Sequence, residues 1–218
     1  MTAKATAPTQ LRIVGALSGR GRTLANLIAA AQAPGARFTI VGVISSSATS
    51  GGVAVAEEAG LPLFIGDFSQ AHAAATAPRL RSWLHERQAT WLTLCGFLKV
   101  FPLFPEYDGR VINIHPSLLP AFGGPGMYGE RVHKAVLTAG TTETGASVHF
   151  VTEHYDEGPV IAQVAVPVEP GDTPASLSAR VFQAESALYP LVINEIAAGT
   201  LPLTDGRRKR FEYANLRI

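Results

Sequence analysis

The 218-residue sequence is poor in several features that mark particular classes of protein. Its single cysteine, Cys95, excludes an intramolecular disulfide framework and a cysteine-based metal site, so nothing requires an oxidising compartment. A formal net charge of +1 provides no strong field for nucleic acid or a membrane surface. No apolar run reaches the roughly 18 to 20 residues that span a bilayer. We therefore expect a cytoplasmic protein without a nucleic-acid or membrane partner.

The two ends of the chain carry the least pattern. Residues 1–10 (MTAKATAPTQ) lack the apolar stretch of a secretory signal and are predicted to be a flexible leader. The dense basic run at residues 207–210 is interpreted as a solvated tail. Residues 11–218 are expected to form one domain, because a chain with 47% hydrophobic residues can bury a sizeable core and no linker interrupts it.

Strands and helices are predicted to alternate through the first half of the chain. LRIVGAL, SGRGRT and TLANLIAAAQA read in order as a strand, a glycine turn and a helix. The order recurs in FTIVGVIS with GGVAVAEEAG, and again in LPLFI with a helical segment near residues 77–87, before the strand TWLTLCGF. This alternation predicts the α/β class, with a parallel sheet and helices on both faces.

The second half has a different character. After Gly96, prolines and glycines punctuate a long segment that is predicted to hold little helix and one strand, VINIH. ASVHFVT and VIAQVAVPV are then predicted as two strands joined by EHYDEGP, and residues 173–199 as a long closing helix. Asp172 or Thr173 would cap this helix, and Gly199 would end it.

The turn SGRGRT at residues 18–23 is the first candidate binding site. A strand runs through two glycines into a helix N-terminus, where free backbone N–H groups favour an anion. The turn lacks the third glycine of the dinucleotide fingerprint and the Gly-Lys-Ser/Thr of a P-loop. It is therefore either a phosphate site or a plain tight turn. Arg22 favours the phosphate, because a guanidinium matches a phosphate but is repelled by the positive end of a helix dipole.

The segment NIHPSLLP at residues 113–120 is the second candidate, since ligands bind at the carboxyl ends of strands in open α/β sheets. Asn113 and His115 are two apart and so point to the same face of a strand. Together they could hold a carbonyl oxygen and shuttle a proton, as acyl transfer requires. The alternative is a hydrogen-bonded structural histidine.

A loop carboxylate and three further histidines complete the candidates. Asp156 in EHYDEGPV is either a turn former or, if the fold brings it near His115, a group that orients the imidazole and stabilises its charged form. His133, His149 and His154 raise the question of a metal ion. Their spacing fits no common zinc pattern, so no metal is expected.

Four stretches resemble, in order, the signatures of the phosphoribosylglycinamide formyltransferase family, also called GAR transformylase: INIHPSLLP, GASVHFVT, DEGPVI and RVFQAESALYPLV. The similarity extends from residue 11 to about residue 201. It implies a single-domain formyltransferase fold with a Rossmann-like, mostly parallel sheet and an antiparallel strand addition toward the C-terminus. The nucleotide is expected in the half formed by about residues 11–100, and the folate and the catalytic groups in about residues 101–203.

The resemblance also implies a reaction. The formyl group of 10-formyltetrahydrofolate, the co-substrate, would pass directly to the amine of glycinamide ribonucleotide in de novo purine biosynthesis, without a metal. By position in the motifs, Asn113 and protonated His115 would stabilise a tetrahedral oxyanion, and Asp156 would keep His115 charged. The implied binding residues are Gly21, Arg22 and Thr23 for the phosphate, Glu185 for the ribose hydroxyls, and Phe97, Leu98, Lys99, Val100 and Phe101 for the folate.

The chain departs from the better-known bacterial members at several positions. Arg22 and Thr23 stand where those members carry Ser-Asn, and Phe182 stands where a polar residue is common. An arginine that meets the folate tail in those members has no counterpart in FSQAHAAATAPRLRSWL.

Other functions share part of this pattern. A different amine acceptor or hydrolysis of formyltetrahydrofolate would use the same catalytic trio. Methionyl-tRNA formyltransferase and formyltetrahydrofolate deformylase, however, each add a second domain, for which the expected single domain leaves no room. A non-catalytic nucleotide-binding module would need no such trio. The expected assembly is a monomer or a homodimer.

Cys95 yields a first prediction, because it lies in the apolar run TWLTLCGF and buried cysteine behaves as a small hydrophobe. We expect Cys95→Ala to keep most of the wild-type turnover, measured by steady-state kinetics on protein whose folding is checked by thermal unfolding. A severe loss of turnover in a folded variant would mean that the thiol takes part in the reaction.

Overall fold

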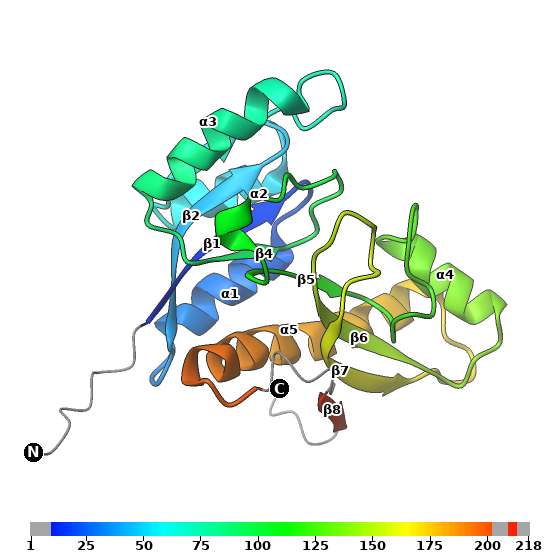
Figure 1. Ribbon diagram of the computed structural model, residues 1–218. Coiled ribbons are helices and arrows are strands. Elements are labelled where there is room, and N and C mark those ends of the chain that lie inside the picture. The colour runs from blue at the N-terminus through cyan, green and yellow to red at the C-terminus, as the bar shows by residue number, and fades with distance from the viewer. Residues whose placement is uncertain (1–9, 202–208, 213–218) are drawn as a thin grey trace, which may run out of the picture.

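The computed structural model describes residues 10–201 and 209–212. Across these residues, eight strands form one sheet in the order β3-β2-β1-β4-β5-β6-β7-β8 (Figure 1). The strands are β1 (Leu11–Leu17), β2 (Phe38–Ser45), β3 (Leu63–Ile65), β4 (Trp91–Leu94), β5 (Val111–His115), β6 (Glu143–Phe150), β7 (Val160–Pro167) and β8 (Lys209–Glu212). The helices are α1 (Arg22–Gln32), α2 (Gly51–Glu58), α3 (Ala73–Glu86), α4 (Glu130–Thr138), α5 (Pro174–Ala198) and a short 3-10 helix, η1 (Pro105–Tyr107). No helix in this part of the chain is long and apolar enough to cross a bilayer.

One of the eight described strands, β6, runs opposite to the other seven. From β3 to β5 all neighbouring strands are parallel. β6 runs antiparallel to β5, β7 runs antiparallel to β6, and β8 is parallel to β7. The predicted α/β class, with a mostly parallel sheet and an antiparallel addition toward the C-terminus, is confirmed.

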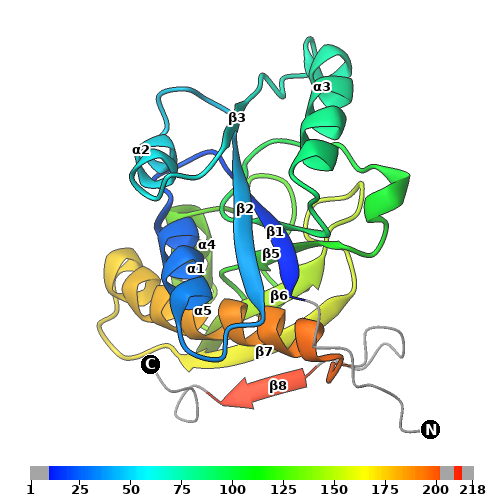
Figure 2. The same cartoon turned by 90° about the vertical axis from the view of Figure 1, so that its left-hand side faces the viewer.

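Helices cover both faces of the sheet, as predicted. Figure 2 shows α1, α2 and α5 on one side of the sheet and α3 on the other. Leu27 of α1 and Leu188 of α5 belong to one buried cluster, and Leu80 of α3 belongs to a second. All three are fully buried, and each such leucine stabilises the fold by about 1.5–3 kcal/mol. The sheet is thus fixed from both sides, and its carboxyl edge is held in place.

Helix α5 begins and ends where the sequence predicts. The Thr173 side chain accepts a hydrogen bond from the Ser176 N–H at 3.1 Å, and the Ser176 hydroxyl accepts one from the Thr173 N–H at 2.9 Å. These two bonds form a capping box, so Thr173 rather than Asp172 is the cap. Gly199 ends the helix in the left-handed conformation, with φ 66°.

Tyr189 joins α5 to the strands that carry the carboxyl edge. Its side chain is fully buried, and its hydroxyl donates to the carbonyl oxygens of Leu94 at 3.2 Å and Ile112 at 3.1 Å. Leu94 ends β4, and Ile112 immediately precedes Asn113 on β5. This contact therefore holds two neighbouring strands at the level of the candidate site.

Two sequence predictions about helices need correction. The segment after Gly96 was expected to hold little helix, but α4 forms there, with Val132 and Val136 one turn apart and fully buried. Helix α3 begins at Ala73 rather than near residue 77, and it contains Pro78 within its first two turns. Pro78 is the sixth residue of the helix, so it removes the hydrogen bond that an N–H there would make to the Ala74 carbonyl.

The structure changes the interpretation of part of the basic run near the C-terminus and does not describe most of the expected leader. Lys209 and Arg210 belong to β8 and form ion pairs of 2.6 Å with Glu195 and Glu143, so they are part of a strand rather than a tail, although both side chains are exposed as expected. The other two residues of that basic run, and residues 1–9 of the expected leader, lie outside the described residues.

Tyr189→Phe tests the link between α5 and the strands. The variant leaves two buried carbonyl groups without their shared donor, so we expect it to lower the free energy of unfolding by about 1–3 kcal/mol. Denaturant titration measures the difference, with Tyr128→Phe as the matched control because Tyr128 is exposed. Equal stability of the two variants would mean that the buried hydroxyl contributes nothing.

Candidate functional site

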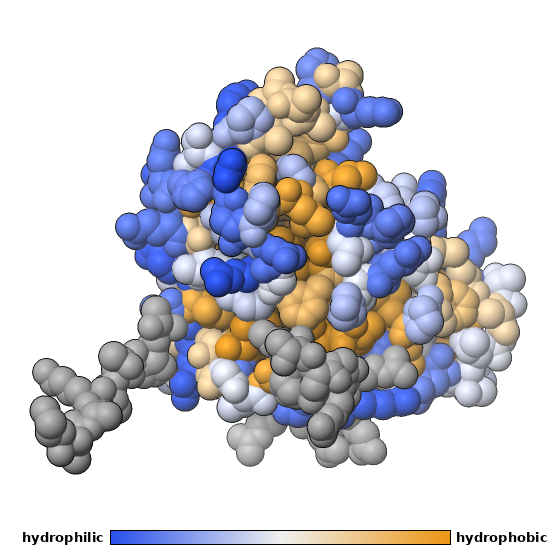
Figure 3. Space-filling model, in the orientation of Figure 1, coloured by the Kyte–Doolittle hydropathy of each residue, from blue (hydrophilic) through white to orange (hydrophobic). Residues whose placement is uncertain are grey.

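A cleft of about 770 Å³ opens at the carboxyl ends of β1, β4 and β5. Its walls come from the turn after β1, the segment after β4, the loops that follow β5 and β6, and one side of α5. Figure 3 shows apolar surface gathered in the middle of the molecule, between the regions that carry α3 and α4. All twelve residues predicted for catalysis or binding line this one cleft.

The predicted catalytic side chains come from two segments that meet at the cleft. Asn113 and His115 lie two apart at the end of β5, and Asp156 lies in the loop between β6 and β7. The Nδ1 atom of His115 is 3.4 Å from an Asp156 carboxylate oxygen. Both side chains are nearly buried, with exposed fractions of 4% and 11%. Burial of this kind strengthens the interaction between two charged or polar groups.

Both ring nitrogens of His115 face protein acceptors. Nε2 donates to the Phe122 carbonyl oxygen at 2.9 Å, and Nδ1 faces Asp156. Burial nevertheless lowers the pKa of His115 below its ordinary value; the charge of Asp156 and the Phe122 carbonyl raise the pKa, but not enough to offset burial. Asp156 does raise the pKa of His115, as expected, yet without substrate the imidazole is mainly neutral at neutral pH.

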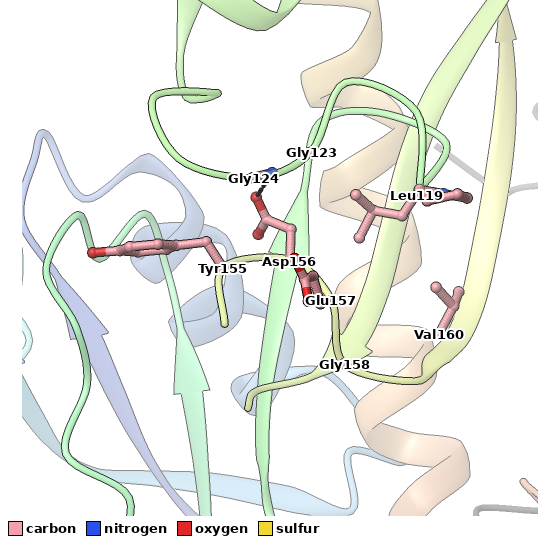
Figure 4. A pocket seen from close by; sticks show the side chains of 9 residues that line it. Leu119, Gly123, Gly124, Tyr155, Asp156, Glu157, Gly158 and Val160 are labelled. Atoms are coloured by element: carbon pink, nitrogen blue, oxygen red, sulfur yellow. Dashed lines mark hydrogen bonds between the residues drawn. The ribbon is translucent and has the colours of Figure 1, made fainter. Parts of the chain in front are cut away.

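Asp156 is held in an unusual backbone conformation, with φ 58° in the left-handed region. Its Oδ2 atom accepts a hydrogen bond from the Gly124 N–H at 3.0 Å, drawn as a dashed line in Figure 4. Burial alone would raise the pKa of Asp156, but hydrogen bonding to His149, the charge of His115 and the Gly124 N–H together lower it. The carboxylate is therefore ionised at neutral pH. It also lines a smaller adjoining pocket of about 500 Å³.

His149 is a site residue that the sequence analysis considered only as a metal ligand. It lies directly opposite Asn113 in the β5–β6 pair and is buried. Its Nδ1 donates to the Phe150 carbonyl oxygen at 2.8 Å, so in the neutral ring Nε2 can accept from the Asn113 amide, 3.1 Å away. Nε2 is also 3.5 Å from Asp156. In the neutral ring His149 thus orients the Asn113 amide, and only in the protonated ring can its Nε2 donate to Asp156.

The other two histidines play different parts. His133 in α4 is buried at the cleft wall, its Nδ1 has no hydrogen-bond partner, and burial lowers its pKa to about 4. His154 is exposed at the cleft. Among residues 10–201 and 209–212, no group of three or more histidine, cysteine or acidic side chains is arranged to hold a metal ion.

The predicted phosphate turn has the geometry of an anion site. Gly21 has φ 80°, and a Cβ atom there would lie 2.6 Å from the Cα of Gly52, so no larger residue fits. Helix α1 starts at Arg22, and no side chain caps its first turn. The free N–H groups of that turn lie beside Thr23 at the cleft and favour a negative charge.

Glu185 faces this turn from α5. It is only partly exposed, and burial raises its pKa to about 8, although the charge of Arg22 opposes the rise. The carboxyl group is therefore mainly protonated at pH 7 and can both donate and accept hydrogen bonds. A hydroxyl-bearing ligand would match this capacity.

The predicted folate segment divides into two kinds of residue. Phe97 and Phe101 are buried and pack edge to face, with Phe97 also against Phe68, so they belong to the core beneath the cleft. Leu98 and Val100 are exposed by 45% and 60% and line the cleft with their side chains free. Leu98 and Val100 can therefore contact a ligand with their whole side chains, and the expectation that the apolar members flank the pterin stays a prediction.

Cys95 lines the cleft but is 5% exposed. Burial raises the pKa of its thiol to about 12, which leaves almost no thiolate at neutral pH. The buried state matches the sequence interpretation of an unreactive side chain.

Comparisons with known proteins show what the chain is similar to. The family model described as formyl transferase matches residues 11–193. The chain is 37% identical over 204 residues to the trifunctional purine biosynthetic protein adenosine-3 of Bos taurus, covering 92% of the chain but 20% of that protein. It is 37% identical to the phosphoribosylglycinamide formyltransferase of Escherichia coli K12, covering 88% of the chain and 90% of that protein. The crystal structure of glycinamide ribonucleotide transformylase 1 from Symbiobacterium toebii superposes with a TM-score of 0.82 at 32% identity, covering 97% of this chain and 98% of that one.

Asp156→Asn tests the electrostatic link to His115. Because the Asp156 charge raises the pKa of His115, its removal is expected to lower that pKa further below the wild-type value. An NMR titration of the His115 ring measures both values. Glu157→Gln, which removes the same charge from an exposed neighbour, should leave the titration unchanged. An unchanged or higher pKa in Asp156→Asn would contradict the link.

Proposed function

The chain belongs to the formyl transferase family, and on that premise we propose that it transfers the formyl group of 10-formyltetrahydrofolate to the amine of glycinamide ribonucleotide in de novo purine biosynthesis. The observation that carries the proposal is the likeness, over nearly the whole length of both chains, to enzymes named for this reaction. The single cleft that gathers the catalytic and binding residues supports it.

The two substrates are assigned to opposite ends of the cleft. The nucleotide phosphate is proposed to bind at Gly21, Arg22 and Thr23, with Glu185 holding the ribose hydroxyls. The folate is proposed to lie along Leu98, Lys99 and Val100, above the buried Phe97 and Phe101. The proposed division of one domain, residues 11–218, has a nucleotide half at about 11–100 and a folate half at about 101–203. Two assignments cross it, because the folate segment at residues 98–100 closes the first half and Glu185 comes from the second.

In the proposed mechanism, the glycinamide amine attacks the formyl carbon directly. The Asn113 amide, oriented by His149, donates to the oxyanion of the tetrahedral intermediate. His115 begins neutral and takes a proton from the amine as it becomes positively charged; the charge of Asp156 then stabilises the imidazolium. As the intermediate collapses, the bond between the formyl carbon and the folate nitrogen breaks, and His115 returns the proton to that nitrogen. One oxyanion donor is worth about 3–4 kcal/mol of barrier, and holding the two reacting groups together contributes about 7–11 kcal/mol.

Access to His115 is part of this mechanism. In the structure the Phe122 carbonyl accepts the Nε2 proton, so that nitrogen reaches the substrate only when this hydrogen bond opens. Nε2 can then take a proton only in the tautomer that carries the ring proton on Nδ1, where Asp156 accepts it. Nδ1 keeps its position beside Asp156 throughout. The proposed assembly is a cytoplasmic monomer or homodimer that binds these small molecules.

The direct test is a change in folate absorbance with 10-formyltetrahydrofolate, measured with and without glycinamide ribonucleotide. Turnover that depends on the nucleotide is the expected result. Turnover without it would indicate hydrolysis of the folate, and turnover with another amine only would identify a different acceptor.

Arg22→Ala tests the assignment of the substrates. Loss of a charged hydrogen bond to the phosphate is expected to weaken nucleotide binding by about 1.5–3 kcal/mol. The KM for glycinamide ribonucleotide should therefore rise by about 10- to 150-fold, while kcat stays nearly unchanged because the contact is the same in the ground and transition states. The KM for the folate should not change. Comparable weakening of the folate would mean that the two ends of the cleft are assigned in reverse.

A further inference from the structure

Arg22 and Phe182 form a contact that the proposed reaction leaves unexplained. The guanidinium carbon of Arg22 lies over the Phe182 ring, 4.1 Å from its centroid. Arg22 is the first residue of α1, and Phe182 lies within α5, so the contact bridges the two helices at the phosphate end of the cleft. At this distance the cation is attracted to the negative face of the ring.

The contact leaves the hydrogen-bonding capacity of Arg22 available. A guanidinium has five N–H donors, and the attraction to a ring face uses no oxygen acceptor. In the described part of the chain, no ion pair or hydrogen bond of the Arg22 side chain is present. The nearby carboxyl group of Glu185 is mainly protonated at pH 7, so it offsets little of the positive charge of Arg22. The cation is thus kept beside the uncapped first turn of α1.

The ring also restricts the arginine. A free arginine side chain has about 2 kcal/mol of rotamer entropy to lose when it binds a ligand. Contact with Phe182 removes part of that freedom before the ligand arrives, which favours binding without adding a contact to the ligand itself. Phenylalanine has no polar group of its own with which to bind a phosphate.

We propose that Phe182 is a positioning residue for the nucleotide, whose ring holds the Arg22 guanidinium at the phosphate site and so sets the affinity for a phosphomonoester acceptor. This inference rests on the proposed function, since it assigns the phosphate of the acceptor to this end of the cleft. Phe182 acts through Arg22 and does not touch the reacting atoms.

Replacement of the ring provides the test. Phe182→Leu keeps an apolar side chain but removes the aromatic face, so the KM for glycinamide ribonucleotide is expected to rise about three- to tenfold, the scale of one cation–π contact. The kcat and the KM for the folate should stay at their wild-type values. Phe182→Tyr retains the aromatic face and should keep the wild-type KM.

A double variant separates an effect through Arg22 from any other effect. In the Arg22→Ala background, Phe182→Leu is expected to cause no further rise in KM, because the group that the ring positions is already absent. The matched control is Arg79→Ala, which removes a second arginine that lies over a phenylalanine, Phe64, at 5.8 Å and outside the cleft. This control should leave every kinetic constant unchanged.

Calorimetric binding of ribose 5-phosphate distinguishes failure of this inference from failure of the proposed function. If the wild type binds it and Phe182→Leu binds it about three- to tenfold more weakly, the positioning role stands even for a protein that does not formylate glycinamide ribonucleotide. Equal binding by the two proteins, no binding by the wild type, or an undiminished effect of Phe182→Leu in the Arg22→Ala background would overturn the role. Thermal unfolding of each variant verifies that the fold is retained.

Discussion

The ionised carboxylate of Asp156 is the group on which the arrangement of the catalytic end depends. A nearly buried charge is strongly unfavourable unless it is paired and hydrogen-bonded. Here two buried histidines and one backbone N–H surround it. Each partner comes from a different segment: His115 from β5, His149 from β6, and Gly124 from the loop that follows β5. Satisfying one charge therefore fixes three segments relative to one another, and it offsets the strain of the positive φ at Asp156.

The reversal of the sheet between β5 and β6 makes this arrangement possible. In an antiparallel pair, residues on neighbouring strands lie directly opposite each other, so that Asn113 faces His149. The antiparallel β6 ends beside the start of β5, where Phe150 lies opposite Ile112, and the loop that follows β6 carries Asp156 back to His115. The catalytic end thus combines a strand end typical of parallel sheets with a cross-strand pair typical of antiparallel ones.

The sequence predicted the bounds of helices and strands well wherever neighbouring residues determine them. VINIH predicted β5 without error, and the Thr173 cap and Gly199 stop predicted the bounds of α5, because capping and hydrophobic period act over a few residues. The sequence was less informative where distant segments meet. The role of His149 depends on the strand register, and the burial of Phe97 and Phe101 depends on the packing of Phe68 from another loop. Helix α4 was missed because glycines precede it, although Val132 and Val136 have helical spacing.

The two ends of the cleft differ in when a positive charge is present. At the catalytic end, Asp156 is ionised and His115 is kept neutral by burial, so the pair gains most from a positive charge that appears only during the reaction. At the phosphate end, Arg22 carries a permanent charge and Glu185 is mainly protonated, so the field there is positive before any ligand arrives. The ring of Phe182 serves that arrangement, because an aromatic face holds a cation without neutralising it, whereas a carboxylate in the same place would compete with the phosphate.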